Sequence, residues 1–262
     1  MNHKISIIIP VLNEETNIGK LLEHLMANFS GKNTCEIIVV DGGSLDGTPA
    51  IVKTFAKINN TKNTEAYYYI DNAVIDTSQV FKHNSKIKIT LLNSKKGRAK
   101  QMNLGAKYAN GNILYFLHAD SFPPKNFDDL IISEVKKGNE AGCFKMQFNS
   151  NHWWLKLASW FTKFNWRICR GGDQSQFITK TLFNTIGGFN ESYIIYEDNI
   201  LINELYARNQ FVVINKTLKT SARLYKKHGV FKLQLIYLVI YIKRWFGADA
   251  EALLSYYKKH IS

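Results

Sequence analysis

The sequence predicts an α/β fold with a mostly parallel central sheet and helices on both faces. Short apolar, β-prone runs alternate with segments of helical periodicity through the first half of the chain. This strand–helix alternation is typical of parallel sheets, because each crossover helix returns the chain to the edge where the next strand begins. The run Ile113–Leu117 is apolar throughout, as expected of a strand buried on both faces.

The first half of the chain supplies four predicted strands and three predicted helices. The strands are expected at Ile5–Val11, Glu36–Asp41, Lys88–Asn93 and Ile113–Leu117. The first helix, Glu15–Phe29, carries apolar residues at the spacing of an amphipathic helix. The second has Thr48 as its expected N-cap and Pro49 at its first helical position. The third begins near Arg98 and is expected to stop at Gly111.

The second half is less regular. We expect strands at Ala141–Phe148 and Phe211–Lys216, an aromatic helix at Trp153–Trp166 and a helix at Val230–Phe246. The aromatic helix contains four tryptophans, which are Trp153, Trp154, Trp160 and Trp166. Such side chains can stack on a sugar or contact lipid, but core packing of most of them is the prediction, since large aromatic side chains are usually buried.

The chain is predicted to form one α/β domain over residues 1–230 and a helical tail over residues 231–262. Residues 58–86 are rich in Asn, Thr and Lys and are expected to be an insertion with little structure, apart from a short strand near Glu65–Ile70. Within the tail, Phe231–Gly247 combines a long apolar face with Lys232 and Lys243. Such a helix either packs on the sheet or lies in the headgroup layer of a membrane.

Composition narrows the function classes. The chain has 34 Lys and Arg against 21 Asp and Glu, a net charge of +13, which favours nucleotide phosphates, nucleic acid or an acidic membrane surface. Three widely spaced cysteines fit neither a metal pattern nor a disulfide framework and favour a reducing cytoplasm. Met1–Pro10 is too short for a signal peptide, and the apolar run Leu233–Ile242 is shorter than the ~20 residues of a spanning helix. We expect a cytoplasmic protein, with the inner face of the cell membrane as its candidate attachment.

Polar side chains follow the ends of all four predicted strands of the first half. They are Asn13 and Glu14 after the first strand, Asp41, Gly42, Gly43, Ser44 and Asp46 after the second, Lys95, Lys96 and Arg98 after the third, and His118 and Asp120 after the fourth. In open α/β sheets, ligands bind beyond the carboxyl ends of the strands. The sequence therefore predicts a ligand site at this edge.

Four segments together resemble family-2 glycosyltransferases of the GT-A fold. They read SIIIPVLNEETNI, EIIVVDGGSLDGT, GRAKQMNLGAKYANGNILYFLHADS and GGFNESYIIYEDNIL. Within the chain, GRAKQMN, FLHAD and GGDQ resemble a bacterial subgroup, the radical-SAM/selenodomain-associated transferases. The resemblance covers roughly Ile5–Lys57 and Lys88–Gly229. It implies transfer of a sugar from a nucleoside-diphosphate-sugar donor to a hydroxyl acceptor, for which a lipid-linked molecule is one candidate, with inversion and with Mg²⁺ or Mn²⁺.

The resemblance assigns the donor nucleotide to the strand-end residues. These are Pro10, Asn13, Glu14, Asp41, Gly43, Lys95 and Arg98. Asp41 can accept a hydrogen bond from a base N–H group, and Gly43 permits close backbone approach. Lys95 and Arg98 precede a helix N-terminus, an arrangement that suits a diphosphate.

The segment HADS is the expected metal site. A divalent ion would neutralise the charge that develops on the leaving diphosphate, and Asp120 can anchor such an ion through hard oxygen ligands. The family usually presents Asp-x-Asp here, whereas His118 replaces the first acid in this chain. His118 either binds a donor oxygen or packs. His228 either completes the metal shell, as C-terminal histidines do in many relatives, or is a surface residue.

The resemblance places the general base on Asp198 of the segment YEDN, with Glu197 beside it. Without the resemblance, the two acids would be interpreted as dipole-complementing residues at the start of the helix Asn199–Arg208. The segment RGGDQSQF brings Asp173 and Gln174 to the expected acceptor side, and its alternative interpretation is a simple turn.

Two other functions are compatible with part of the sequence. A nucleotidyltransferase has a related fold, but its usual Gly-rich basic signature after the first strand is replaced here by the acidic PVLNEE. A basic nucleic-acid-binding protein fits the net charge, yet the sequence contains no recognition-helix or RNA-binding motif. We therefore expect no nucleic acid partner.

Overall fold

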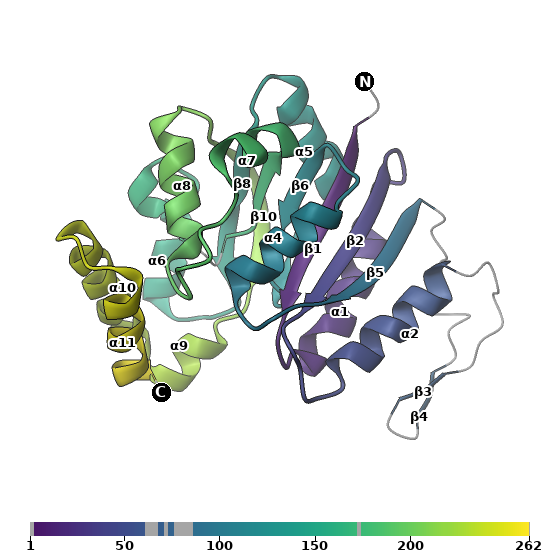
Figure 1. Cartoon of the computed structure of the whole chain (residues 1–262), viewed down its shortest axis with the longest axis horizontal. Helices are drawn as coiled ribbons and strands as arrows, with labels where there is room; N and C mark the ends of the chain where they lie inside the picture. Colours follow the sequence, from purple (N-terminus) through teal and green to yellow (C-terminus); the bar gives the residue numbers. More distant parts are fainter. Residues whose placement is uncertain (1–2, 61–67, 71–72, 76–85, 172–173, 262) are drawn as a thin grey trace.

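The computed structural model describes residues 3–60, 68–70, 73–75, 86–171 and 174–261. Its centre is an eight-stranded sheet with the strand order β5-β2-β1-β6-β9-β8-β10-β7 (Figure 1). The strands of this sheet are β1 (Lys4–Val11), β2 (Thr34–Asp41), β5 (Ile87–Asn93), β6 (Ile113–Phe116), β7 (Ser121–Phe122), β8 (Ala141–Phe148), β9 (Gln176–Thr179) and β10 (Val212–Thr220).

Most of the sheet is parallel, as the sequence predicts. β1 pairs in parallel with β2 and β6, and β2 pairs in parallel with β5. β9 is antiparallel to both β6 and β8, while β10 is parallel to β8 and antiparallel to β7. Within this sheet, β9 and β7 are therefore the strands that run against the others.

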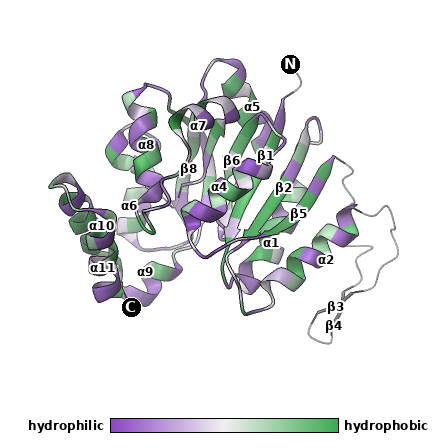
Figure 2. Cartoon of the chain, in the orientation of Figure 1, coloured by the Kyte–Doolittle hydropathy of each residue, from purple (hydrophilic) through white to green (hydrophobic). Residues whose placement is uncertain are grey.

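Helices cover both faces of the sheet. One face carries α1 (Glu15–Asn28), α2 (Thr48–Asn60), α5 (Phe127–Lys136), α6 (Trp153–Phe161), α9 (Arg223–His228), α10 (Val230–Trp245) and α11 (Ala250–Ile261), and the other carries α4 (Arg98–Tyr108), α7 (Lys180–Ile186) and α8 (Glu197–Ala207). Ile7 and Ile9 pack into the first layer and Ile8 into the second, all three fully buried. In Figure 2 the central strands are accordingly hydrophobic and the surrounding helices are mixed.

The tail helices contribute to the core of the first face. Leu233, Ile236 and Ile240 of α10 and Leu253 of α11 are buried in the same apolar cluster as the sheet residues. One side of α10 thus packs on the domain, which is one of the two arrangements that the sequence allows. Among the described residues, no helix combines the length and apolar character needed to cross a membrane.

Two helix ends differ from the sequence prediction. Thr48 is the first residue of α2 rather than its N-cap, and Asp46 accepts the hydrogen bond from the Thr48 N–H group at 3.0 Å. α4 ends at Tyr108, before Gly111. A Cβ atom on Gly111 would lie 2.5 Å from Ser6 Oγ, so this glycine permits close chain approach rather than ending the helix.

Other boundaries were also wrong. The aromatic helix ends at Phe161 instead of Trp166, and β10 continues past Lys216 to Thr220 through an irregularity between Ile214 and Thr217. The elements α5, α7, α9 and β7 were not predicted, while α11 lies within the predicted helical tail. The expected insertion over residues 58–86 lies partly outside the described residues; its described part includes the end of α2 and a separate antiparallel pair, β3 (Tyr68–Ile70) and β4 (Ala73–Ile75).

The prediction that most tryptophans of the aromatic helix belong to the core is wrong. Trp153, Trp160 and Trp166 are 61%, 51% and 55% exposed. α6 instead buries Leu155 and Ser159, which are four residues apart and therefore share one helical face. The tryptophans lie on other sides of the helix or beyond its end.

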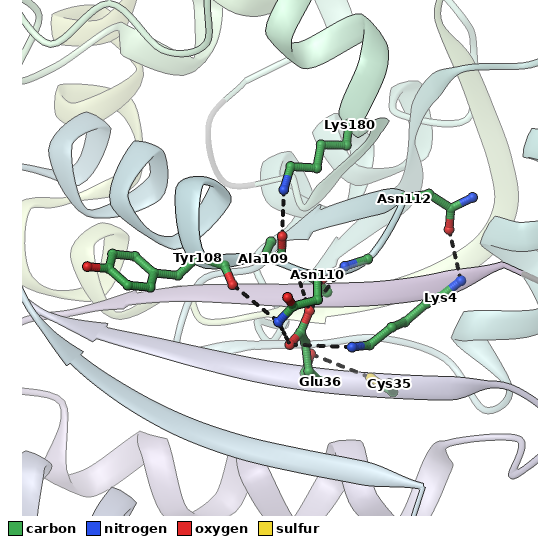
Figure 3. A network of polar contacts seen from close by, with 10 residues as sticks. Lys4, Cys35, Glu36, Tyr108, Ala109, Asn110, Asn112 and Lys180 are labelled. Carbon is green, nitrogen blue, oxygen red and sulfur yellow. Dashed lines mark hydrogen bonds and ion pairs between the residues drawn. The ribbon is translucent and has the colours of Figure 1, made fainter.

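A buried carboxylate joins three elements at the amino edge of the sheet (Figure 3). Glu36 of β2 accepts hydrogen bonds from Ser6 Oγ at 2.5 Å, from the Asn110 N–H group at 2.6 Å and from the Gly111 N–H group at 3.1 Å. Lys4 Nζ lies 3.7 Å from the same carboxylate. Burial by itself would raise the pKa of Glu36, but the hydrogen bonds from Ser6 and Asn110 and the charge of Lys4 together lower it.

We expect Glu36→Gln to lower the free energy of unfolding by about 1–3 kcal/mol near neutral pH, because buried donors lose their charged acceptor. The folded-state pKa lies below the ordinary 4.5, so the stabilisation is present above that value and is lost as the pH falls through the folded pKa. The difference between wild type and variant should therefore shrink in acid. Urea unfolding at about pH 7 and about pH 3.5 measures it.

The matched control is Glu23→Gln, which neutralises an exposed glutamate on α1 and should leave stability unchanged at both pH values. An equal loss for Glu36→Gln at the two pH values would contradict the role given to its charge.

Candidate active site

Four strand ends of the sheet meet at one edge. β5, β2, β1 and β6 are consecutive neighbours and all parallel, so their carboxyl ends lie together. The sequence-predicted residues that follow these ends are Asn13 and Glu14, Asp41 and Gly43, Lys95 and Arg98, and His118 and Asp120. The topology thus gathers the chain segments that the sequence analysis singled out.

The loops after β1 and β2 are braced against each other. Asn13 has a left-handed backbone with φ 55°, and its Oδ1 accepts a hydrogen bond from the Leu45 N–H group at 2.9 Å. The Asn13 N–H group donates to Ser44 Oγ at 2.9 Å, and the Glu14 N–H group donates to Thr48 Oγ1 at 2.8 Å. These bonds fix the two loops as one unit.

Asp41 shapes its own loop. The residue is 4% exposed, and its carboxylate accepts hydrogen bonds from the Gly43 N–H group at 3.2 Å and from the hydroxyl of Ser44 at 2.5 Å. Gly43 has φ +91°, a conformation that favours glycine. Pro10, another predicted donor residue, lies in β1 opposite Val40 and is half-buried.

α4 fastens the same edge from the other face of the sheet. The side-chain amide Nε2 of Gln101 donates to the carbonyl groups of Val11 and Val40, at 2.8 Å each. Val11 is the last residue of β1, and Val40 is the penultimate residue of β2. Arg98, the first residue of α4, is therefore held beside the two loops.

Arg223 joins two of the predicted site carboxylates. This first residue of α9 pairs through both terminal nitrogens with Glu14, with an Nη1 to Oε2 distance of 2.9 Å. Its Nε also lies 3.5 Å from Asp120 Oδ2. The hydrogen bonds to Glu14 raise the pKa of the Arg223 guanidinium. Sequence reasoning missed Arg223, because it lies 209 residues from Glu14 and only His228 was considered in that segment.

Arg98 forms a second cluster of the same kind. Its Nη1 lies 3.1 Å from Glu197 Oε1 and 3.5 Å from Asp198 Oδ2, at the start of α8. The Glu197 side chain is 1% exposed and the Asp198 side chain 12%. Burial raises the pKa of Glu197, and the charge of Arg98 opposes this shift. The predicted phosphate-binding arginine thus contacts the predicted catalytic acids.

The predicted metal residues lie on two different elements. Asp120 and half-buried His118 follow β6, while half-buried His228 ends α9, five residues beyond Arg223. Among the described residues, no three His, Cys, Asp or Glu side chains are gathered as a metal-binding group. Asp120, His118 and His228 therefore do not form a preassembled three-ligand set.

Gln174 of the predicted acceptor pair takes part in a buried cluster. Its Oε1 accepts a hydrogen bond from Arg170 Nη1 at 3.0 Å, and its Nε2 donates to the Cys169 carbonyl at 3.2 Å. Arg170 is 2% exposed and also donates to the Thr162 carbonyl at 2.7 Å. Gln174 thus supports the polypeptide around it. Asp173 lies outside the described residues.

The chain matches a known family over most of its length. The sequence model of the family described as Glycosyl transferase family 2 covers residues 6–190. The chain belongs to this family. It is 30% identical over 123 residues to "Dolichyl N-acetyl-alpha-D-glucosaminyl phosphate 3-beta-D-2,3-diacetamido-2,3-dideoxy-beta-D-glucuronosyltransferase" of Methanococcus voltae, a match that covers 47% of this chain and 31% of that protein.

A second relative extends the match within family 2. "Undecaprenyl-phosphate 4-deoxy-4-formamido-L-arabinose transferase" of Proteus mirabilis is 25% identical over 158 residues, which covers 60% of this chain and 41% of that protein. The matches therefore span well under half of each of these curated relatives.

Solved structures confirm the predicted GT-A fold. S. aureus TarS residues 1–349 in complex with UDP-GlcNAc superpose with a TM-score of 0.60 at 21% identity, covering 83% of this chain and 58% of that one. Mannosyltransferase PcManGT from Pyrobaculum calidifontis, in complex with GDP-Man and Mn²⁺, gives a TM-score of 0.63 at 16% identity, covering 95% and 66%.

In this family-2 chain we expect Arg98→Gln to lower the free energy of unfolding by about 1 kcal/mol near pH 8, a modest value because Arg98 is half exposed and screened. Removing its charge raises the pKa of Glu197 further above the ordinary value. A group whose folded-state pKa lies above its unfolded one destabilises the fold as the pH rises through the folded pKa. Near pH 5 Glu197 is more fully protonated in both proteins, so Arg98→Gln should lower the free energy of unfolding by less than it does near pH 8. Urea midpoints at the two pH values measure the effect.

Lys95→Gln is the control, since it removes an exposed positive charge from the same connection between β5 and α4. A loss for Arg98→Gln that does not depend on pH would show that its contacts with the acids are not electrostatic.

Proposed function

We propose that the protein transfers one sugar from a nucleoside-diphosphate sugar to a hydroxyl acceptor, with inversion at the anomeric carbon and with Asp198 as the general base. The observation that carries this proposal is the pairing of Arg98 with Glu197 and Asp198. It brings an acidic pair next to the helix N-terminus at which a diphosphate would be held. Family membership supports the same reaction class.

The proposed reaction is a single in-line displacement. The acceptor oxygen attacks the anomeric carbon, the bond to the diphosphate breaks, and Asp198 takes the acceptor proton. Asp198 suits this task better than Glu197, because its side chain is 12% exposed while that of Glu197 is 1% exposed. Glu197 would instead act as a buried countercharge that holds Arg98.

The donor would lie across the loops after β1, β2 and β5. Asn13, Glu14 and Asp41 would face the nucleoside, with Gly43 allowing close backbone approach and Pro10 beside them near the end of β1. Lys95 and Arg98 would face the diphosphate, where positive charge stabilises the leaving group. Bound UDP-GlcNAc and GDP-Man in two proteins of the same fold support a nucleoside-diphosphate-sugar donor.

We propose Mg²⁺ or Mn²⁺ as a partner of the diphosphate. The carboxylates of Glu14 and Asp120 converge on the cationic Arg223, which marks a place where positive charge is favoured. Asp120 would hold the ion, with His118 and His228 as further candidate ligands. When bound, such an ion neutralises charge on the departing diphosphate. The charge of Arg223 compensates the two carboxylates in the structure.

We further propose a lipid-linked acceptor and a cytoplasmic protein at the inner face of the membrane. Two relatives carry dolichyl and undecaprenyl-phosphate in their names. Asp173 would lie on the acceptor side, and Gln174 would act there indirectly, through Arg170. The motifs GRAKQMN, FLHAD and GGDQ support membership of the radical-SAM/selenodomain-associated subgroup, and residues 1–230 would form the transferase domain.

A panel of nucleotides tests the donor class. UDP or GDP with Mn²⁺ should raise the melting temperature, because a ligand that binds only the folded state stabilises it. No shift with any nucleoside diphosphate, together with a salt-sensitive shift by an oligonucleotide, would reject the proposal in favour of a nucleic-acid-binding protein.

Asp198→Asn separates catalysis from folding. It keeps the side-chain shape but removes proton acceptance, so turnover should fall by ~10²–10⁴. Binding of the donor diphosphate should stay near normal and the melting temperature should change little. Glu197→Gln should retain more activity. Turnover of Asp198→Asn at nearly the wild-type rate would move the base elsewhere, with Asp173 as the next candidate.

Asp120→Asn tests the metal. The variant should lose most turnover and its dependence on added Mg²⁺ or Mn²⁺, because the neutral amide is a poor ligand for these hard cations. His118→Ala should have a smaller effect. If EDTA leaves wild-type turnover unchanged, the metal role of Asp120 is wrong.

A further inference from the structure

Exposed apolar side chains gather on two neighbouring helices. On α6 and the one-turn helix η1 (Arg167–Cys169), Trp153, Trp160 and Ile168 are 61%, 51% and 89% exposed. On α10 and directly after it, Leu235, Trp245 and Phe246 are 60%, 87% and 86% exposed. We call this surface the α6–α10 face.

The two helices present one continuous surface. The ring of Phe231, at the start of α10, lies 6.3 Å from the ring of Trp153 and 5.9 Å from the ring of Trp154, both on α6. Figure 1 shows α6 and α10 side by side at the same end of the molecule. Because α10 buries Leu233 and Ile240 in the core, its outward residues are left on the opposite side. Large exposed apolar surfaces of this kind mark interaction sites.

The charged side chains within the two segments that form this face are all basic. Residues 152–170 contain four Lys or Arg, of which Arg170 is buried, and residues 223–247 contain six, of which Arg223 pairs with Glu14 and Asp120. Neither segment contains Asp or Glu. Lys163 Nζ lies 3.8 Å above the Trp160 ring, and Lys156 and Lys232 are exposed. Tryptophans and phenylalanines flanked by lysines are the composition of helices that lie in the headgroup layer of a bilayer.

We propose that the α6–α10 face docks on an anionic lipid bilayer, with its aromatic side chains in the headgroup layer and its lysines on the lipid phosphates. Exposed aromatic side chains interspersed with lysines, in segments without acidic residues, favour this occupant, because the negative surface of an anionic leaflet attracts Lys and Arg. The docking does not require glycosyl transfer; it deepens the membrane location given under the proposed function by naming the face that makes the contact.

The docked face would lie beside the proposed base. Tyr241 of α10 donates to Asn199 Oδ1 at 2.7 Å, and its ring packs against Tyr196 at 5.2 Å between centroids. Arg167 of η1 reaches the same Asn199 Oδ1 at 3.3 Å. Asn199 follows Asp198 directly in the chain, and Tyr196 precedes it by two residues. If the proposed function holds, a lipid-linked acceptor would present its head group to Asp198 directly from the bilayer.

The test is co-sedimentation of the full chain with vesicles of phosphatidylcholine mixed with phosphatidylglycerol, against vesicles of phosphatidylcholine alone. We expect binding to the anionic vesicles at low salt, and its loss at high salt. The double variant Trp245→Ser, Phe246→Ser should bind about tenfold more weakly. Lys163→Gln and Lys232→Gln should each weaken binding by about fivefold. Tyr108→Ser, which removes an exposed aromatic from α4 on the other face of the sheet, should bind like wild type.

An unchanged melting temperature of each variant without ligand shows that the fold is intact, and the shift with UDP or GDP reports on the proposed function independently of vesicle binding. Failure of the wild type to bind anionic vesicles at low salt overturns the docking proposal. The proposal is also overturned if the wild type does not bind vesicles but forms a concentration-dependent dimer that the double variant abolishes. The face would then bind a second copy of the chain. Equal vesicle binding by wild type and all variants would also overturn it.

Discussion

The parallel pairing of β1 with β2 and β6 positions both polar centres of the molecule. Its register sets Ser6 opposite Glu36 at one end and Val11 opposite Asp41 at the other. The first pair starts the buried network around Glu36, and the second begins the loops that carry Asn13 and Asp41. A slip of one residue would turn the buried side chains of β1 to the wrong layers and separate both pairs.

At the carboxyl edge of the sheet, two arginines offset the mutual repulsion of four carboxylates that would otherwise destabilise the folded state. Arg98 compensates Glu197 and Asp198, and Arg223 compensates Glu14 and Asp120. Each arginine comes from the first residue of a helix, so helix placement decides the charge balance. A diphosphate would attract these arginines and a divalent ion would attract the carboxylates. A bound diphosphate would therefore compete with the carboxylates for the arginines, and a bound ion would compete with the arginines for the carboxylates.

The tail connects this site to the surface of the molecule. One side of α10 completes the core through residues such as Leu233 and Ile240, while the other joins α6 in an exposed aromatic face. Between the two sides, Tyr241 contacts Asn199, next to Asp198. The helix therefore serves the fold and the proposed membrane contact with different residues.

Local patterns in the sequence determined the first four long strands, the helices between them and the residues at the strand ends, because periodicity and strand–helix order depend on neighbouring residues. Only the tertiary structure decided which charges meet. Arg223 and Glu14 pair across 209 residues, a separation over which a sequence pattern has no fixed geometry. It also decided that Trp153, Trp160 and Trp166 face outward, because a segment rich in aromatics does not indicate which side of a helix the core will cover.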